Sequence, residues 1–99
     1  MTMIIVHDTF VCKPGNAGKA AKMFKEMMAK SSEVLNILTD ITGKYHRVVM
    51  VSQYDSLAAY EKALEAYMNP SDEMKKQMAG MKDFQEMYTT GKREIFKVW

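Results

Sequence analysis

The sequence predicts one α+β domain whose strands and helices follow the order β-α-β-β-α-β. Three observations lead to this prediction. Apolar, β-branched segments stand at both ends of the 99-residue chain. Two stretches between them repeat apolar residues at helical spacing, and a glycine turn joins two central strand-like segments. A chain of this length has room for a single hydrophobic core, so residues 1–99 are expected to form one domain.

The first predicted strand covers residues 2–12, which are mostly apolar or β-branched. Pro14 and Gly15 end this strand, and Asn16 is expected to cap the helix that follows. Apolar residues of this helix share one face, because they recur at the spacing i, i+3, i+4 and i+7. They are Ala17, Ala20, Ala21, Phe24, Met27 and Met28.

A β-hairpin is predicted next, with strands at residues 34–42 and 45–54 joined by a tight turn at Gly43. The second of these strands contains four consecutive apolar residues at 48–51. Such a run is typical of a strand that is buried on both faces.

The second helical region is expected to consist of two segments, because proline lacks the backbone donor that a helix interior needs. Asp55 and Ser56 cap the first segment, and the break falls at Asn69 and Pro70. Gly91 then opens a last strand. The apolar residues at helical spacing are Leu57, Tyr60, Leu64, Tyr67 and Met68 in the first segment and Met74, Met78, Met81, Phe84 and Tyr88 in the second.

This order of elements is the ferredoxin-like arrangement, and right-handed connections give an antiparallel sheet with the strand order 4-1-3-2. Both helical regions then cover one face of the sheet, while the other face still carries apolar residues. An uncovered apolar face of this size favours association, and a second copy of the chain is the expected partner. We therefore predict a homodimer through the helix-free sheet face.

Composition excludes several classes of function. The net charge of +2 is too small to favour nucleic acid. The strand at 45–54 has no glycine and an aliphatic middle, unlike RNA-recognition strands. No apolar run approaches the ~20 residues of a membrane-spanning helix, and residues 3–6 are too few for the core of a signal peptide. We expect a soluble, cytoplasmic protein with no membrane partner.

Three segments together span most of the chain and carry a resemblance: VCKPGNA at 11–17, VSQYDSLAAY at 51–60 and REIFKV at 93–98. They resemble the dimeric α/β-barrel superfamily, and within it the NIPSNAP-type and antibiotic-biosynthesis-monooxygenase-type members. The resemblance implies two subunits packed sheet against sheet, but no single reaction. Its haem-degrading members use an Asn on the first strand and a His on the second helix; this sequence has neither, and no cofactor is expected.

Candidate catalytic residues are few. The histidines His7 and His46 are expected to lie too far apart to share a metal ion, so no metal site is predicted. For His7, in the middle of the first strand, two interpretations stay open. It is either a buried core or interface histidine, or a polar group that lines a cavity between sheet and helices. The second interpretation makes His7 and Tyr54 the candidate catalytic residues, while the roles of His46 and Cys12 stay open.

Eleven methionines in the chain suit a pocket for a flat apolar molecule, since methionine is flexible and polarizable. The same residues equally suit a core beneath a broken helix. The predicted function is binding of a small apolar or aromatic molecule between sheet and helices, extending to a cofactor-independent, monooxygenase-like reaction. The alternative is a non-catalytic ligand-binding or structural dimer module. The candidate ligand-binding residues are Phe24, Met28, Tyr60, Leu64, Tyr67 and Met78.

Overall fold

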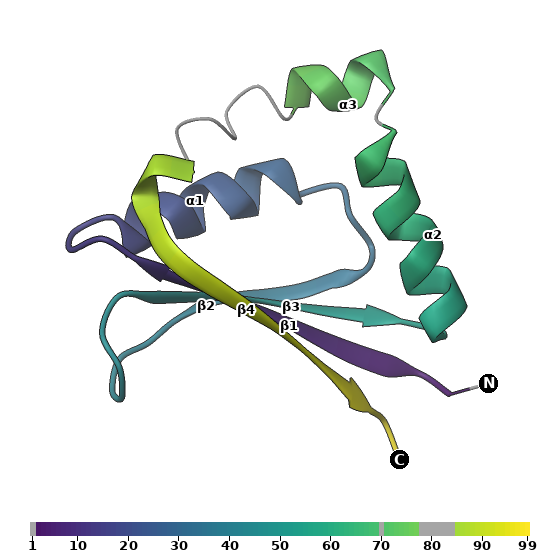
Figure 1. The fold of residues 1–99 in the computed structure, drawn as a ribbon, viewed down its shortest axis with the longest axis horizontal. Helices are drawn as coiled ribbons and strands as arrows, with labels where there is room; N and C mark the ends of the chain where they lie inside the picture. The colour runs from purple at the N-terminus through teal and green to yellow at the C-terminus, as the bar shows by residue number, and fades with distance from the viewer. Residues whose placement is uncertain (1, 70, 78–84) are drawn as a thin grey trace.

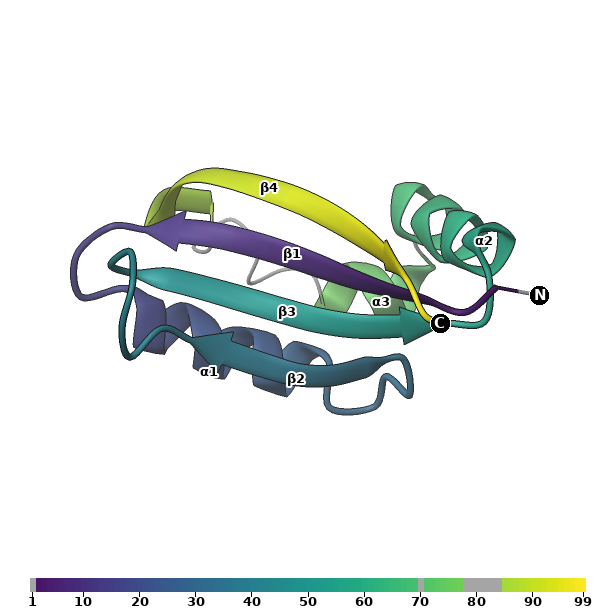
Figure 2. The same ribbon diagram turned by 90° about the horizontal axis from the view of Figure 1, so that it is seen from below.

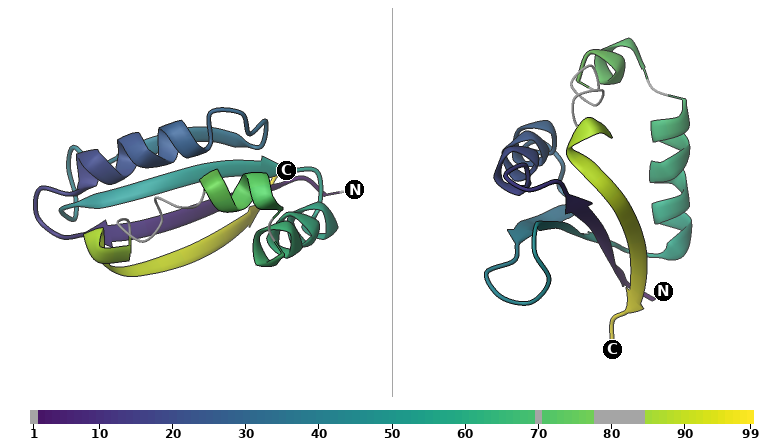
Figure 3. Two further views of the ribbon diagram at one scale, coloured as in Figure 1. Left: turned by 90° about the horizontal axis from the view of Figure 1, so that it is seen from above. Right: turned by 60° about the vertical axis from the view of Figure 1, so that its left-hand side comes forward.

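The computed structural model describes residues 2–69, 71–77 and 85–99. It contains a four-stranded antiparallel sheet with helices on one face (Figure 1). Two views at right angles show the same two layers (Figure 3). In chain order the elements are β1 (Ile4–Cys12), α1 (Ala17–Met27), β2 (Val34–Thr39), β3 (Arg47–Tyr54), α2 (Leu57–Met68), α3 (Asp72–Gln77) and β4 (Tyr88–Lys97).

The strand order β2-β3-β1-β4 confirms the predicted sheet and the ferredoxin-like fold. Side chains alternate between the two faces of the central strand β1, as the period of a strand requires. Ile4, Val6 and Asp8 are buried on the face that carries the helices. Ile5 and His7 therefore lie on the opposite face, which we call the helix-free face.

The core beneath the helices has two parts. Beneath α1, a cluster is formed by Cys12, Ala20, Phe24 and Val48. Beneath α2, a second cluster is formed by Ile4, Val6 and Tyr60, with Tyr54 and Leu64 packed against it. The central strand β1 contributes Cys12 to the first cluster and Ile4 and Val6 to the second, so it contributes to both parts of the core.

Strand boundaries differ from the predicted ones at two places. The hairpin strands are shorter, because Asp40 accepts hydrogen bonds from the backbone N and the Nε of Arg47 and closes a loop over residues 40–46. The last strand is longer and begins at Tyr88 instead of residue 92. The Tyr88 ring packs against the Phe10 ring, with centroids 5.3 Å apart, so the prediction of Tyr88 on a helix is wrong.

The predicted break of the second helix is confirmed, since α2 ends at Met68 and α3 begins at Asp72. Ser56 caps α2 as expected, because its Oγ accepts a hydrogen bond of 3.1 Å from the backbone N of Ala59. Asn16 is the N-cap residue of α1, as predicted, although its side chain makes no capping hydrogen bond. Leu57 and Met68 are exposed instead of buried, so the apolar face of α2 is narrower than its spacing predicts.

Seen from below, α1 and α3 lie behind the sheet, and α2 stands beside its end, near the start of β1 and the end of β4 (Figure 2). Cross-strand register places the side chains of β3 and β4 opposite those of β1, so that each face is continuous across the strands. The apolar members of the helix-free face are Ile5, Val11, Leu38, Val49, Val51 and Phe96. Leu38 and Phe96 are exposed, so this face presents apolar surface to its surroundings.

Substitution by alanine should change the free energy of unfolding in opposite directions at two glycines. A Cβ on Gly91, in β4, would lie 3.2 Å from the carbonyl oxygen of Thr9 and 3.3 Å from the Phe10 ring. Gly91→Ala should therefore lower the free energy of unfolding by about 1 kcal/mol or more, as overpacking does. Gly18→Ala, on the exposed side of α1 with no atom within 4 Å of the new carbon, should raise it by about 0.5–1 kcal/mol. Urea unfolding of both variants checks this, and destabilisation by both would contradict it.

Candidate functional site

Asp8 and Arg93 form an ion pair on the helix-bearing face of the sheet. Asp8 belongs to the buried row of β1, and Arg93 lies directly opposite it on β4. The Nε of Arg93 donates to Oδ1 of Asp8 at 2.6 Å, and the Asp8 side chain is only 10% exposed. A carboxylate at such a position needs a cationic partner, because burial without one costs several kcal/mol.

Tyr60 of α2 lies over this ion pair. The guanidinium carbon of Arg93 is 5.7 Å from the centre of the Tyr60 ring, a cation–π distance. Tyr60 is 7% exposed, and its hydroxyl has no hydrogen-bond partner among the described residues. A buried hydroxyl without a partner is destabilising by about 1–3 kcal/mol, so this donor is available to a group that the described residues do not supply.

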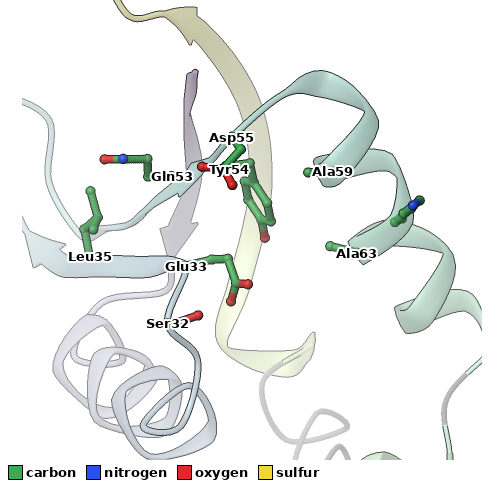
Figure 4. A pocket seen from close by; sticks show the side chains of 9 residues that line it. Ser32, Glu33, Leu35, Gln53, Tyr54, Asp55, Ala59 and Ala63 are labelled. Carbon is green, nitrogen blue, oxygen red and sulfur yellow. The ribbon is translucent and has the colours of Figure 1, made fainter. Parts of the chain in front are cut away.

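Tyr54 connects Tyr60 to an open cleft. The two rings meet edge to face with centroids 5.0 Å apart. Tyr54 also lines a cleft of about 490 Å³ between the end of β3, the start of β2 and α2. Figure 4 shows the Tyr54 ring directed toward the space between Glu33 and the alanines Ala59 and Ala63 of α2. These two alanines leave room on the α2 side, where a larger side chain would fill the cleft.

Polar side chains surround the rest of the cleft. Besides Tyr54, Ala59 and Ala63, the lining residues are Ser32, Glu33, Leu35, Gln53, Asp55 and Lys62. The wall is thus mixed, with an aromatic ring and small apolar groups beside both acidic and basic side chains. Such a lining suits a small molecule that has an apolar body and a polar substituent.

The charges and burial around Asp8, Arg93 and Tyr60 determine which chemistry these three residues favour. Burial raises the pKa of the Tyr60 hydroxyl, which the Arg93 charge opposes and the Asp8 charge reinforces. The hydrogen bond to Asp8 raises the pKa of Arg93 further above its ordinary value. At neutral pH the Tyr60 hydroxyl is therefore protonated and lies beside a cationic Arg93. Tyr60 is suited to donate a hydrogen bond and unsuited to act as a phenolate base.

The structure does not place His7 in a cavity between sheet and helices, so this part of the prediction is wrong. His7 follows the odd-numbered alternation of β1 and lies on the helix-free face, beside Val51 and opposite Glu94. Its ring packs edge to face on Phe96, with centroids 5.0 Å apart. His7 therefore lies on the face where the other interpretation, an interface histidine, would place it.

The candidate ligand-binding residues do not all surround one cavity. Phe24 is buried in the cluster beneath α1, whereas Tyr60 and Leu64 belong to the cluster beneath α2. Met28 lines a separate groove between the end of α1 and β2. Tyr67 lies on α2 but its side chain is outside the described part of the structure, and Met78 is outside it altogether. Tyr54, Tyr60 and Leu64 are thus predicted site residues that the structure brings together in one cluster.

Cys12 and His46 meet through the backbone only. The amide of Cys12 donates to the carbonyl oxygen of His46 at 2.7 Å and joins β1 to the hairpin. Cys12 is buried, and burial raises the pKa of its thiol. This overrides the slight activation that the neighbouring lysine would give, because a raised pKa disfavours the thiolate. Across residues 2–69, 71–77 and 85–99, no three His, Cys, Asp or Glu side chains are grouped to hold a metal ion.

Asp8 and Arg93 are the site residues that the sequence prediction omits. A signal for Asp8 exists, since it shares the alternation of Ile4, Val6 and Phe10 and so falls on a buried row. Arg93 lies 85 residues after Asp8 in the chain. It could be found only from the pairing register of β1 and β4. Pattern analysis alone does not provide that register.

No protein-family profile and no curated protein sequence matches the chain. Solved structures do match its fold. A NIPSNAP family protein from Agrobacterium tumefaciens is 13% identical with a TM-score of 0.80, covering 98% of this chain and 86% of its own. An uncharacterised NIPSNAP-like domain protein from Burkholderia xenovorans is 14% identical with a TM-score of 0.68, covering 95% and 83%.

A candidate antibiotic biosynthesis monooxygenase from Caulobacter crescentus is 20% identical with a TM-score of 0.66, covering 99% of this chain and 91% of its own. At such identities the likeness shows the fold. The chain therefore has the ferredoxin-like α+β fold of these NIPSNAP and monooxygenase-type structures, as its sequence predicts. Among the described helices, none has the length and apolar character needed to cross a membrane.

Removing the Asp8 charge tests the ion pair. Asp8→Asn should lower the free energy of unfolding by about 1–2 kcal/mol, less than a fully buried pair would lose because Arg93 is half-exposed. Glu94→Gln breaks the exposed pair between Glu94 and Lys92 and should change stability by less than about 0.5 kcal/mol. Chemical denaturation of both variants measures the difference, and equal effects would show that Asp8 has no special role.

Alkaline pH tests the environment of Tyr60. Because its pKa is raised in the folded protein, the unfolded chain loses this proton first. Stability from this group is complete below the ordinary tyrosine value of about 10 and falls as pH rises through the folded value. Tyr60→Phe should remove that part of the loss, measured as urea midpoints between about pH 9 and about pH 11.

Tyr45→Phe is the control, since the Tyr45 ring is exposed. The change in urea midpoint between about pH 9 and about pH 11 should be the same in this variant as in the parent chain. The same alkaline loss in the Tyr60→Phe variant as in the parent would contradict a buried, neutral Tyr60.

Proposed function

We propose that the chain binds a small aromatic molecule with an acceptor oxygen between the sheet and α2. The observation that carries this proposal is the buried Tyr60 hydroxyl, which lacks a partner among the described residues. A carbonyl or phenolic oxygen of a ligand would satisfy this donor. The neighbouring Arg93 and Asp8 offset each other in charge, so the site favours a neutral polar group over a free anion.

The cleft gives such a ligand a route of approach. Tyr54 belongs to the wall of the cleft and contacts the Tyr60 ring. A planar ligand can pack against Tyr54 with its ring, as aromatic pairs do. On the opposite wall, the small side chains of Ala59 and Ala63 leave space for the ligand. In this proposal Tyr54 is a binding residue that orients the ligand, and Tyr60 donates the hydrogen bond.

A second candidate function is cofactor-independent oxygenation of an electron-rich aromatic molecule. The finding that favours it is the fold shared with the candidate monooxygenase from Caulobacter crescentus. That likeness concerns the backbone, and within the described residues the Tyr60 cluster explains binding without requiring a reaction. Binding is therefore the function we propose.

We also propose that a second copy of the chain covers the helix-free face. Apolar side chains from all four strands lie there, and Leu38 and Phe96 are exposed in the single chain. His7 would then be an interface residue, because its ring lies at the centre of this face beside Phe96. A two-fold axis allows the same apolar patch to serve both copies.

A pair of probes tests the ligand proposal. α-Tetralone has an aromatic ring and a carbonyl oxygen, and tetralin is the same hydrocarbon frame without that oxygen. Amide NMR titration should show saturable α-tetralone binding with shifts at residues around Tyr54 and Ala59, and at least about tenfold weaker binding of tetralin. Tyr60→Phe should remove the preference for α-tetralone, while Tyr45→Phe should keep it. Equal affinity for both probes in the parent chain would refute the proposed donor.

Sedimentation equilibrium tests the dimer. The parent chain should give twice its mass of 11.4 kDa at micromolar concentration. Phe96→Glu places a charge in the proposed interface and should shift the equilibrium toward the monomer. Leu57→Glu changes an exposed apolar residue on α2 and should leave the dimer intact. A parent chain that stays monomeric at every concentration would contradict this part of the proposal.

A further inference from the structure

A second polar concavity lies on the helix-free face, near the loop of residues 40–46. It is a groove of about 200 Å³. The lining residues are Thr9, Val11, Lys44, Arg47, Thr90, Gly91 and Lys92. Three of them are cationic, two carry hydroxyl groups, and none is acidic.

Sheet register explains why these side chains converge. Thr9 lies opposite Lys92 on β4, and Val11 lies opposite both Arg47 on β3 and Thr90 on β4. All these positions belong to the same face of the sheet. The central strand thus forms the floor of the groove, with a cation on either side, and Lys44 approaches from the hairpin loop.

The loop holds Arg47 in one orientation. Asp40 accepts from the Nε of Arg47 at 2.9 Å, which leaves the two terminal nitrogens of the guanidinium as further donors. A Cβ on Gly43 would lie 2.9 Å from one of these nitrogens, so the loop backbone passes close to the guanidinium. Gly43 also has a φ of 101°, which glycine adopts without strain.

The other groups have free capacity as well. Lys92 pairs with Glu94 at 3.2 Å, and an ammonium group has three donors. Lys44 makes no ion pair within the described residues. Thr9 is only 6% exposed although no described helix covers this face, which shows that the surrounding side chains enclose the floor of the groove.

We propose that this groove binds the phosphoryl group of a small molecule. A guanidinium and two ammonium groups from three directions match the oxygens of a phosphate, and charge-assisted hydrogen bonds of this kind are the strong ones. This groove is separate from the proposed aromatic site at Tyr54 and Tyr60, since the sheet lies between them. All its donors come from one chain. The groove lies on the helix-free face toward the hairpin loop, so the second copy proposed above would have to leave this end of the sheet uncovered.

Titration with inorganic phosphate tests the proposal. Amide NMR spectra of the intact chain should show saturable shifts at Thr9, Gly91 and Lys92, with sodium chloride at equal ionic strength as the blank. Lys44→Gln and Lys92→Gln should each weaken phosphate binding about tenfold, the value of one charge-assisted hydrogen bond. Lys22→Gln removes an exposed lysine of α1 and should leave the affinity within about twofold.

Two results would overturn the proposal. One is a titration in which phosphate and chloride give the same unsaturable shifts. The other is equal loss of affinity in the Lys44→Gln and Lys22→Gln variants, which would indicate attraction by general charge and no built site. The α-tetralone titration is read out at other residues, so failure of the aromatic site and failure of the phosphate site are distinguishable.

Discussion

The ion pair between Asp8 and Arg93 is the interaction on which the candidate site depends. Asp8 lies in a row of β1 that is otherwise apolar and buried. The pair joins β1 to β4 at the register that puts Arg93 beneath α2. Tyr60 then packs over the guanidinium, and Tyr54 packs against Tyr60. One buried carboxylate thereby connects the central strand, the edge strand, the helix and the cleft.

Alternation along β1 gives the sheet two faces of different character. Its even-numbered side chains face the helices and support the candidate site at Tyr54 and Tyr60. Its odd-numbered side chains form the helix-free face, with His7 near the middle and the Thr9 groove toward the hairpin loop. A one-residue slip of register would exchange the two sets completely. The Asp8–Arg93 pair opposes such a slip, because it would leave a carboxylate without its cation.

Much of the fold follows from the sequence, while the site follows only in part. Hydrophobic spacing and the turn at Gly43 predict the order of elements, and Pro70 predicts the break after α2. Tyr54 and Tyr60 are also among the predicted site residues, Tyr54 as a candidate catalytic group and Tyr60 from its place in the helical spacing. For His7 the sequence leaves two interpretations open, and the structure decides between them because its neighbour Asp8 occupies the buried row. Finding Arg93 requires the pairing of distant strands, which no local pattern contains.

The central claim is that the Tyr60 hydroxyl is an available donor that meets the oxygen of a ligand. NMR of the chain with its tyrosines isotopically labelled at Cζ tests this most directly, because that carbon reports hydrogen bonding of the attached hydroxyl. The account predicts that saturating α-tetralone shifts the Tyr60 signal strongly, that tetralin does not, and that the Tyr45 signal stays in place with either. A Tyr60 signal that is unchanged by α-tetralone, while other tyrosine signals move, would contradict it.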